Sequence, residues 1–219
     1  MKKISWMSAL LALLFLLSAC GGNAPAETEP EPTPTPTATP VPEKVLVVYF
    51  SCPGELPADG SVKKGSTRLL AEMIARRFYS DVYEIRPSEE DRYPETYEEL
   101  APVALEERDN KVRPALRGEL PDLREYRTIF IGGPIWHGDW PMILYTFLEG
   151  VDLSGKRVIP FAVGEGEGIS AIRRSLALNT PDSTVEGGLT LLGHVVREAP
   201  QEAEETLDRY LRDLGFEMD

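Results

Sequence analysis

The sequence predicts an α/β domain with a doubly wound, five-stranded parallel sheet and helices on both of its faces. Three observations lead to this prediction. After residue 43, short runs rich in β-branched and aromatic residues alternate five times with segments of helical periodicity. The strand-like runs are apolar throughout, as expected for strands that are buried on both faces. Several of them end in glycine-containing loops, which suits the carboxyl edge of a parallel sheet, where such folds bind ligands.

The first half of the domain contributes three of the expected strands. Its elements, in chain order, are a strand at 44–50, a long loop at 51–64, a helix that opens at Gly65-Ser66-Thr67, a strand at 82–85, a polar helix at 93–108, a loop at 113–125 and a strand at 127–131. Apolar residues recur at helical spacing in the first helix, at Leu70, Met73, Ile74 and Phe78. The second helix has only a narrow apolar face, formed by Tyr97, Leu100, Ala104 and Leu105.

The second half contributes the other two strands. Its elements are a helix with Pro141 in its first turn, a strand at 156–161, a glycine-rich loop at 163–168, a helix that ends near residue 178, a weak strand within 184–192 that Gly187 and Gly188 interrupt, and a C-terminal helix. Proline favours the first turn of a helix because its missing N–H has no partner to lose there. The C-terminal helix gathers apolar residues on one face, at Leu207, Tyr210, Leu211 and Leu214.

The first 43 residues are predicted to export and tether the domain. Residues 1–20 have a basic start, an apolar stretch and small residues before Cys20, as a secretory signal peptide does. Leu17-Ser18-Ala19-Cys20 resembles a bacterial lipoprotein box, which implies that Cys20 is lipidated; an ordinary cleaved signal with a chance cysteine is the alternative. Residues 21–43 are rich in Pro, Thr and Glu, so we expect a disordered linker before a domain at 44–219. These features predict an extracytoplasmic protein anchored to the bacterial membrane by lipid.

Charge and cysteine content exclude some functions. The formal net charge of −13 disfavours nucleic acid and anionic lipid as direct partners. Cys52 is the only cysteine after Cys20, so we expect no internal disulfide. His137 and His194 are too few and too far apart in the sequence to indicate a metal site. No arrangement typical of nucleophilic catalysis is evident.

The loop after the first strand suits a phosphate group. It ends at the start of a helix, where free backbone N–H groups combine with the hydroxyl groups of Ser51, Ser66 and Thr67. The alternative is that Ser66 or Thr67 merely caps the helix. The sequence has neither a Gly-x-Gly-x-x-Gly nor a Walker pattern, so a dinucleotide or a nucleotide triphosphate is not indicated.

The loop after the third strand carries two tryptophans, Trp136 and Trp140. They form a wall of a ligand site or pack against the next helix, and their spacing does not decide between these roles. His137 lies between them and either hydrogen-bonds a ligand or is solvated.

These loops resemble those of the flavodoxin family. Tyr49-Phe50-Ser51, Gly65-Ser66-Thr67 and Ala71-Glu72-Met73-Ile74-Ala75 are similar to the start of a flavodoxin. Gly132-Gly133-Pro134-Ile135-Trp136-His137-Gly138 is similar to a loop of a bacterial branch of NAD(P)H-dependent FMN reductase-like proteins. The resemblance covers roughly residues 44–214. It implies the flavodoxin-like strand order 2-1-3-4-5, with flavin mononucleotide (FMN) in the crevice beside the first strand.

The resemblance also implies which residues bind the cofactor. The phosphate would lie against Ser51, Gly65, Ser66 and Thr67. The isoalloxazine ring would lie against Pro134, Ile135, Trp136, His137 and Gly138. Its other side would be covered by the loop that contains Gly164, Gly166 and Gly168. With a flavin in place, Trp136 faces the pocket and Trp140 anchors the next helix.

The sequence departs from the family at two of these loops. About eleven additional residues, from Cys52 to roughly Lys64, lengthen the first loop, which either packs over the phosphate or extends into solvent. Cys52 is a redox thiol or, more simply, a small loop residue; Lys63 and Lys64 contact the phosphate or are solvated. In the fourth-strand loop, Glu165 and Glu167 stand where relatives have a hydroxyl and an imidazole, and no aromatic residue is available to cover the second ring face.

The sequence therefore predicts an FMN-binding, flavodoxin-like redox protein at the membrane surface. An uncovered ring face suits hydride transfer from NAD(P)H to an acceptor such as a quinone better than shielded electron exchange. The two carboxylates would make the flavin more reducing. The resemblance leaves open whether the protein is a homodimer. The alternative function is a flavin-free extracytoplasmic binding module on the same fold.

Overall fold

The computed structural model of the chain describes residues 44–56 and 60–217. The predicted signal peptide, the lipidation site at Cys20 and the linker at 21–43 lie outside these residues. Within the described ranges, no helix has the length and hydropathy needed to cross a membrane.

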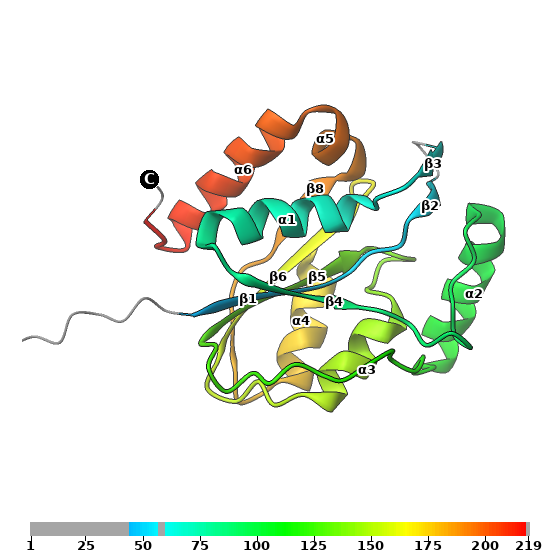
Figure 1. Cartoon of the computed structure of the whole chain (residues 1–219), viewed down its shortest axis with the longest axis horizontal. Helices are drawn as coiled ribbons and strands as arrows, with labels where there is room; N and C mark the ends of the chain where they lie inside the picture. Colours follow the sequence, from blue (N-terminus) through cyan, green and yellow to red (C-terminus); the bar gives the residue numbers. More distant parts are fainter. Residues whose placement is uncertain (1–43, 57–59, 218–219) are drawn as a thin grey trace, which may run out of the picture. The chain divides into compact units, whose positions relative to one another are not determined.

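The main sheet is parallel and has the predicted strand order (Figure 1). Its strands are β1 (Val45–Phe50), β4 (Asp81–Ile85), β5 (Thr128–Pro134), β6 (Arg157–Gly164), β7 (Thr184–Val185) and β8 (Leu189–Leu192). They are arranged as β4-β1-β5-β6-β7, and β8 also pairs with β6. Because β7 and β8 are the two pieces of the expected fifth strand, on either side of Gly187 and Gly188, this is the order 2-1-3-4-5. The predicted α/β fold class is confirmed.

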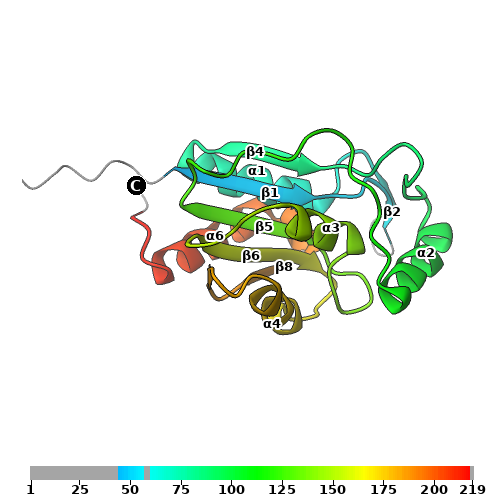
Figure 2. The same cartoon turned by 90° about the horizontal axis from the view of Figure 1, so that it is seen from below.

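Helices cover both faces of the sheet, as predicted (Figures 1 and 2). One face packs against α1 (Ser66–Phe78), α5 (Gly193–Glu198) and α6 (Pro200–Asp213). The opposite face packs against α3 (Met142–Gly150) and α4 (Ser170–Asn179).

Strand β1 is the centre of both hydrophobic layers, because successive side chains of a strand point to opposite faces. All six of its residues are buried. Val45, Val47 and Tyr49 contribute to the layer under α1 and α6. Leu46, Val48 and Phe50 contribute to the layer over α3 and α4. The continuous apolar run at the start of the domain is thus explained by burial on both sides.

Helix α2 (Tyr97–Asn110) begins four residues later than expected. Thr96 is its N-cap: the Thr96 hydroxyl accepts a hydrogen bond from the backbone N–H of Glu99 and donates to the Glu99 carboxylate. This reciprocal pair stops the helix from extending toward Tyr93. Figures 1 and 2 show α2 beyond the carboxyl end of the sheet, beside β2.

Two further elements differ from the sequence prediction. The segment expected to be a loop at 51–64 contains a small antiparallel hairpin, formed by β2 (Gly54–Leu56) and β3 (Gly60–Val62). The short helix α5 separates the fifth strand from the C-terminal helix and has no counterpart in the predicted elements.

Strands β5 and β6 both run about three residues further than predicted. Glycine makes this possible at Gly132, where a Cβ atom would lie only 2.5 Å from the carbonyl oxygen of Phe161 on the neighbouring strand. The extensions carry the loop residues to the carboxyl edge of the sheet. Pro141 is the N-cap of α3, one residue before the predicted position.

Candidate functional site

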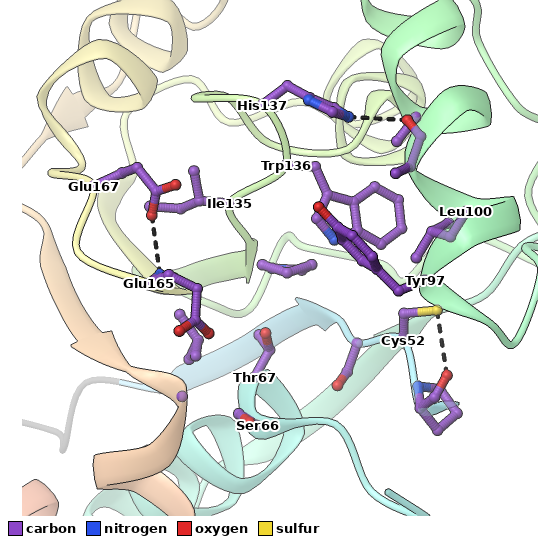
Figure 3. Close-up of a pocket in the computed structure, with 18 of the residues that line it drawn as sticks. Cys52, Ser66, Thr67, Tyr97, Leu100, Ile135, Trp136, His137, Glu165 and Glu167 are labelled. Atoms are coloured by element: carbon purple, nitrogen blue, oxygen red, sulfur yellow. Dashed lines mark hydrogen bonds between the residues drawn. The ribbon is translucent and has the colours of Figure 1, made fainter. Parts of the chain in front are cut away.

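A cleft with a volume of about 280 Å³ lies at the carboxyl edge of the sheet (Figure 3). It is bounded by the ends of β1, β5 and β6, the starts of α1 and α5, and one face of α2. The cleft is polar where the two helices begin and largely apolar beside α2. All three loops singled out from the sequence contribute residues to it.

The polar end of the cleft is built around the first turn of α1. Gly65 is the N-cap residue, and it has no side chain with which to cap the helix. Ser66 and Thr67 occupy the first two helical positions, so the alternative that one of them merely caps α1 is wrong. Their side chains are buried, with exposed fractions of 6% and 3%, and both line the cleft. The Ser51 hydroxyl accepts a hydrogen bond from the backbone N–H of Arg68 at 3.2 Å.

The hydroxyl of Thr67 has no hydrogen-bond partner among the described residues. The residue as a whole is buried, but its hydroxyl oxygen keeps access to the cleft and is therefore available to a ligand. Here the hydroxyl is directed into the cleft, beside the positive end of the α1 dipole (Figure 3). This arrangement suits an anion with several acceptor oxygens.

Gly65 is required by a close approach of two segments. A Cβ atom at this position would lie 2.4 Å from Ser51 Oγ and 2.7 Å from the carbonyl oxygen of Cys52. The end of β1 can therefore pack directly against the start of α1, and Ser51 joins Ser66 and Thr67 in the cleft only because residue 65 has no side chain.

Arg197 of α5 also reaches this end of the cleft, although no sequence signal singled it out. Its Nη1 atom donates a hydrogen bond to the Ser66 hydroxyl, across 131 residues of sequence. Burial lowers the pKa of the guanidinium, and the charge of Glu198 opposes that shift.

The opposite end of the cleft has an aromatic wall, Trp136. Its ring is held edge-on by Phe50, with centroids 5.6 Å apart, and by Tyr93, with centroids 5.1 Å apart. Trp140, in contrast, is 1% exposed and belongs to the hydrophobic core next to α3. The two tryptophans therefore have the separate positions that the family resemblance implied.

A tight turn presents Trp136 to the cleft. Trp136 and Asp139 exchange two backbone hydrogen bonds, of 2.8 and 3.1 Å. The two residues between them, His137 and Gly138, have φ angles of 51° and 84°. Glycine adopts this conformation without strain, whereas His137 adopts it within the constraints of the turn.

Helix α2 forms the remaining apolar wall. Tyr97, Leu100, Ala101 and Ala104 line the cleft, so three of the four residues of the predicted apolar face point to the site rather than the sheet. The fourth, Leu105, is exposed and does not line the cleft. The helix is tied to the Trp136 turn by two hydrogen bonds: one joins the His137 Nε2 atom to the carbonyl oxygen of Ala101 at 2.9 Å, and Arg108 donates to the His137 carbonyl oxygen at 2.8 Å. His137 thus has a structural contact in addition to its position at the cleft.

The loop after β6 brings two carboxylates to the cleft, those of Glu165 and Glu167. The Glu167 carboxylate accepts a hydrogen bond from the backbone N–H of Glu165 at 2.9 Å (Figure 3). A Cβ atom at Gly164 would lie 2.9 Å from the same carboxylate. Glu167 is therefore folded over Gly164, and one N–H group of this loop is already occupied by it.

Cys52 fits the simpler interpretation as a small loop residue, and Lys63 and Lys64 fit the interpretation that they do not contact the phosphate. Cys52 lines the cleft, but burial, aided by the charge of Glu95, raises the pKa of its thiol to about 11, so the reactive thiolate is scarce at neutral pH. Lys63 is exposed, and Lys64 pairs with Glu72 at 3.3 Å; neither lines the cleft.

Most of the predicted cofactor-binding residues come together in this one cleft. Those that line it are Ser51, Ser66, Thr67, Pro134, Ile135, Trp136, His137 and Gly164. Gly65 does not line the cleft but is the N-cap residue of α1, directly before Ser66 and Thr67. Those that do not line it are Gly138, Gly166 and Gly168. Among the described residues, no group of three His, Cys, Asp or Glu side chains is positioned to hold a metal ion.

Comparison with known proteins gives consistent matches. The chain matches the family model described as Flavodoxin over residues 44–207. A proposed flavoprotein from Bacteroides uniformis is 32% identical with a TM-score of 0.55, and the match covers 73% of this chain and 98% of that chain. A proposed flavoprotein from Bacteroides eggerthii is 29% identical with a TM-score of 0.59, covering 80% and 99% of the two chains.

A third solved structure is more distant. A flavoprotein from Lactobacillus acidophilus, solved in complex with FMN, is 22% identical with a TM-score of 0.55, and the match covers 72% of this chain and 97% of that chain. A search of curated proteins finds no match. The match covers 97% or more of each of these solved chains, so we expect residues 44–219 to fold by themselves.

Proposed function

Because the chain belongs to the flavodoxin family, we propose that its cleft binds FMN and that the protein acts in redox chemistry. The observation that carries this proposal is the Thr67 hydroxyl, which has no partner among the described residues and faces the same cleft as Trp136. An anion-binding helix start and an aromatic wall in one cleft match the two chemically different ends of FMN.

The residues of the polar end fit a phosphate monoester. Ser66 and Thr67 offer two hydroxyl groups, and their backbone N–H groups precede the first intrahelical hydrogen bonds of α1, which begin at Arg68. The helix dipole adds a favourable field for a dianion. A flavoprotein of the same fold was solved with FMN bound, which supports the same ligand here.

The residues of the apolar end fit a flat aromatic ring system. Trp136 is fixed by Phe50 and Tyr93 and cannot rotate freely, so it offers a preorganised surface. Ile135 and the α2 face exclude water from the same region. Together they supply the contact area that a planar ring needs for binding.

We further propose that the protein is an oxidoreductase rather than a pure electron carrier. When bound, FMN supplies two-electron chemistry, with NAD(P)H as a hydride donor and a quinone as one class of acceptor. The loop after β6 contributes glycines and two carboxylates but no aromatic side chain, so this chain leaves room for a second ring against the flavin. The carboxylates of Glu165 and Glu167 disfavour additional negative charge beside them.

We also propose that the domain functions outside the cytoplasmic membrane, attached through lipidated Cys20 and the linker at 21–43. The support is the sequence alone: the signal-like start, the lipoprotein-box resemblance and the Pro/Thr/Glu-rich spacer. Labelling with a radioactive fatty acid in a bacterial host tests it, because Cys20→Ala should abolish incorporation.

FMN titration of the purified domain, residues 44–219, tests the main proposal. We expect stoichiometric quenching of flavin fluorescence with micromolar or tighter affinity. If the folded domain takes up no FMN, the redox function is refuted and the flavin-free binding module becomes the better explanation. For the loaded domain, stopped-flow reduction by NAD(P)H must be faster than that of free FMN; equal rates would remove the hydride-transfer proposal while leaving FMN binding intact.

A further inference from the structure

The polar end of the cleft contains a cation that the family resemblance does not account for. Arg197 lies in α5, after the last strand of the sheet, and its guanidinium donates a hydrogen bond to the Ser66 hydroxyl. Ser66 is one of the two buried hydroxyl residues at the start of α1. A positive charge therefore lies directly beside the helix start that is proposed to hold the phosphate.

The charges around the cleft make this position distinctive. Of the described residues that line the cleft, Arg197 is the only arginine or lysine, whereas three are acidic: Glu95, Glu165 and Glu167. Two of the acids, Glu165 and Glu167, lie in the loop after β6. The cleft thus has one permanent positive charge, and that charge is at the phosphate end.

Arg197 is partly desolvated where it lies. Burial lowers the pKa of its guanidinium, which means that the surroundings oppose the charge more than Glu198 favours it. A dianionic phosphate at the start of α1 would favour the charged guanidinium and could accept two hydrogen bonds from it.

Gly193 lies directly beside the proposed phosphate partners. A Cβ atom at Gly193 would lie 3.5 Å from Arg197 Nη1, 3.5 Å from Glu165 Oε1 and 3.6 Å from Ser66 Oγ. Two candidate phosphate partners, Arg197 and Ser66, and one carboxylate, Glu165, therefore lie around one position that has no side chain. The carboxylate opposes an anion there, and Arg197 is the cation that offsets it. Gly193 is buried and is the first residue of α5, and its φ angle is not positive. The backbone conformation at this position therefore does not require glycine.

We propose that Arg197 binds the phosphate of FMN together with Ser66 and Thr67, and that it makes this site selective for phosphorylated flavin over riboflavin. This inference rests on the proposed function, since it assigns a residue to the ligand proposed above. Arg197 acts as a specificity residue: it contacts the phosphate and has no part in the transfer of electrons.

Parallel titrations with FMN and riboflavin test the inference. In the domain at residues 44–219, we expect Arg197→Gln to weaken FMN binding at least tenfold and to change riboflavin binding less than twofold. Arg197→Lys should recover part of the lost affinity, because it restores the charge without the bidentate geometry. Raising the ionic strength should weaken FMN binding to the native domain more than to Arg197→Gln. Arg76→Gln, which removes an exposed arginine at the other end of α1, is the matched control and should leave both affinities unchanged.

Gly193→Ala provides a second test that does not touch the arginine. The added methyl group makes only ordinary contacts in the free protein, and alanine favours the helix, so thermal stability should be unchanged or higher. FMN affinity should nevertheless fall severalfold, because the methyl group lies 3.5 and 3.6 Å from the Arg197 and Ser66 atoms proposed to contact the phosphate and would crowd it.

The outcomes separate this inference from the proposed function. If the native domain binds neither flavin, the proposed function fails. If it binds FMN but Arg197→Gln weakens FMN and riboflavin equally, or weakens neither, the proposed function stands and the assignment of Arg197 is overturned. If Arg197→Gln does not fold, Gly193→Ala decides: unchanged FMN affinity in that variant overturns the assignment.

Discussion

The substitution Thr67→Val tests the polar end of the cleft most directly. Valine has nearly the same shape as threonine and replaces only the hydroxyl group by a methyl group. In the free protein the hydroxyl has no hydrogen-bond partner among the described residues, although the residue is 3% exposed. Its removal therefore breaks no protein contact, and the free energy of unfolding should stay the same or rise by up to about 1 kcal/mol.

The effect on FMN binding should be large by comparison. A hydrogen bond to a charged group contributes about 1.5–3 kcal/mol. Since about 1.4 kcal/mol corresponds to a tenfold change in the dissociation constant, Thr67→Val should weaken FMN binding by roughly 10- to 150-fold. Riboflavin has no phosphate, so its dissociation constant should stay within about twofold of the native value.

Fluorescence-quenching titrations with both flavins, together with thermal melts of the flavin-free domain, give the required measurements. Thr67→Ser keeps the hydroxyl and serves as the matched control, with near-native FMN affinity. Equal losses for FMN and riboflavin would refute the reasoning, because the hydroxyl would then not act on the phosphate. A melting temperature lowered by several degrees would refute it as well, since the hydroxyl would then have a structural partner.

Three further predictions concern the aromatic wall, the carboxylates and a partly buried acid, Glu107. Trp136→Ala should weaken FMN and riboflavin alike, by about tenfold or more in titrations, because it removes contact with the ring that both ligands share. Glu167→Gln should raise the midpoint potential of bound FMN by tens of millivolts in a redox titration, because one negative charge beside the ring is lost; a lower potential would contradict the electrostatic argument. Burial raises the pKa of Glu107, against the hydrogen bond that it accepts from Tyr93, so its protonated form is favoured in the folded state. Stability should therefore fall as pH rises from the unfolded pKa of this group through its folded pKa, and denaturant melts of Glu107→Gln should show a shallower fall than the native domain.

The sequence predicted the parts of the site that are local in the chain. Ser66 and Thr67 follow a buried strand and open a helix, and Trp136 follows another strand, so the topology of a parallel sheet alone brings them to one edge. The sequence also predicted the apolar face of α2, including Leu100 and Ala104. It did not reveal what that face contacts, because periodicity describes a helix but not its partner. The structure turns the face toward the cleft, where Thr96 sets the start of the helix.

Arg197 shows what local patterns cannot provide. It is a single arginine in a six-residue helix, a segment too short for periodicity to identify. Its contact with Ser66 depends on how β8 ends beside β6 and how α5 packs on α1, elements that are far apart in the sequence. The same limit applies to Glu167, whose hydrogen bond to the N–H of Glu165 depends on the conformation of a glycine-rich loop. In both cases the sequence shows the type of residue but not the group with which it forms a hydrogen bond.

The charge distribution in the cleft links flavin affinity to redox behaviour. Arg197 lies at the phosphate end, and Glu165 and Glu167 belong to the loop proposed to cover the ring. With FMN bound in the proposed orientation, the arginine favours the phosphate in both oxidation states. Glu165, whose carboxylate lies beside the same position as Arg197 and Ser66, opposes the phosphate in both states, whereas the Glu167 carboxylate opposes the charge that reduction adds to the ring. Flavin binding and flavin reduction form one thermodynamic cycle. A reduction potential that is lower for bound than for free FMN therefore means that the domain binds reduced FMN more weakly than oxidised FMN, by the same free energy. The domain should therefore bind oxidised FMN more tightly than reduced FMN, which favours acquisition of the cofactor in its oxidised form, the form expected where oxygen is present.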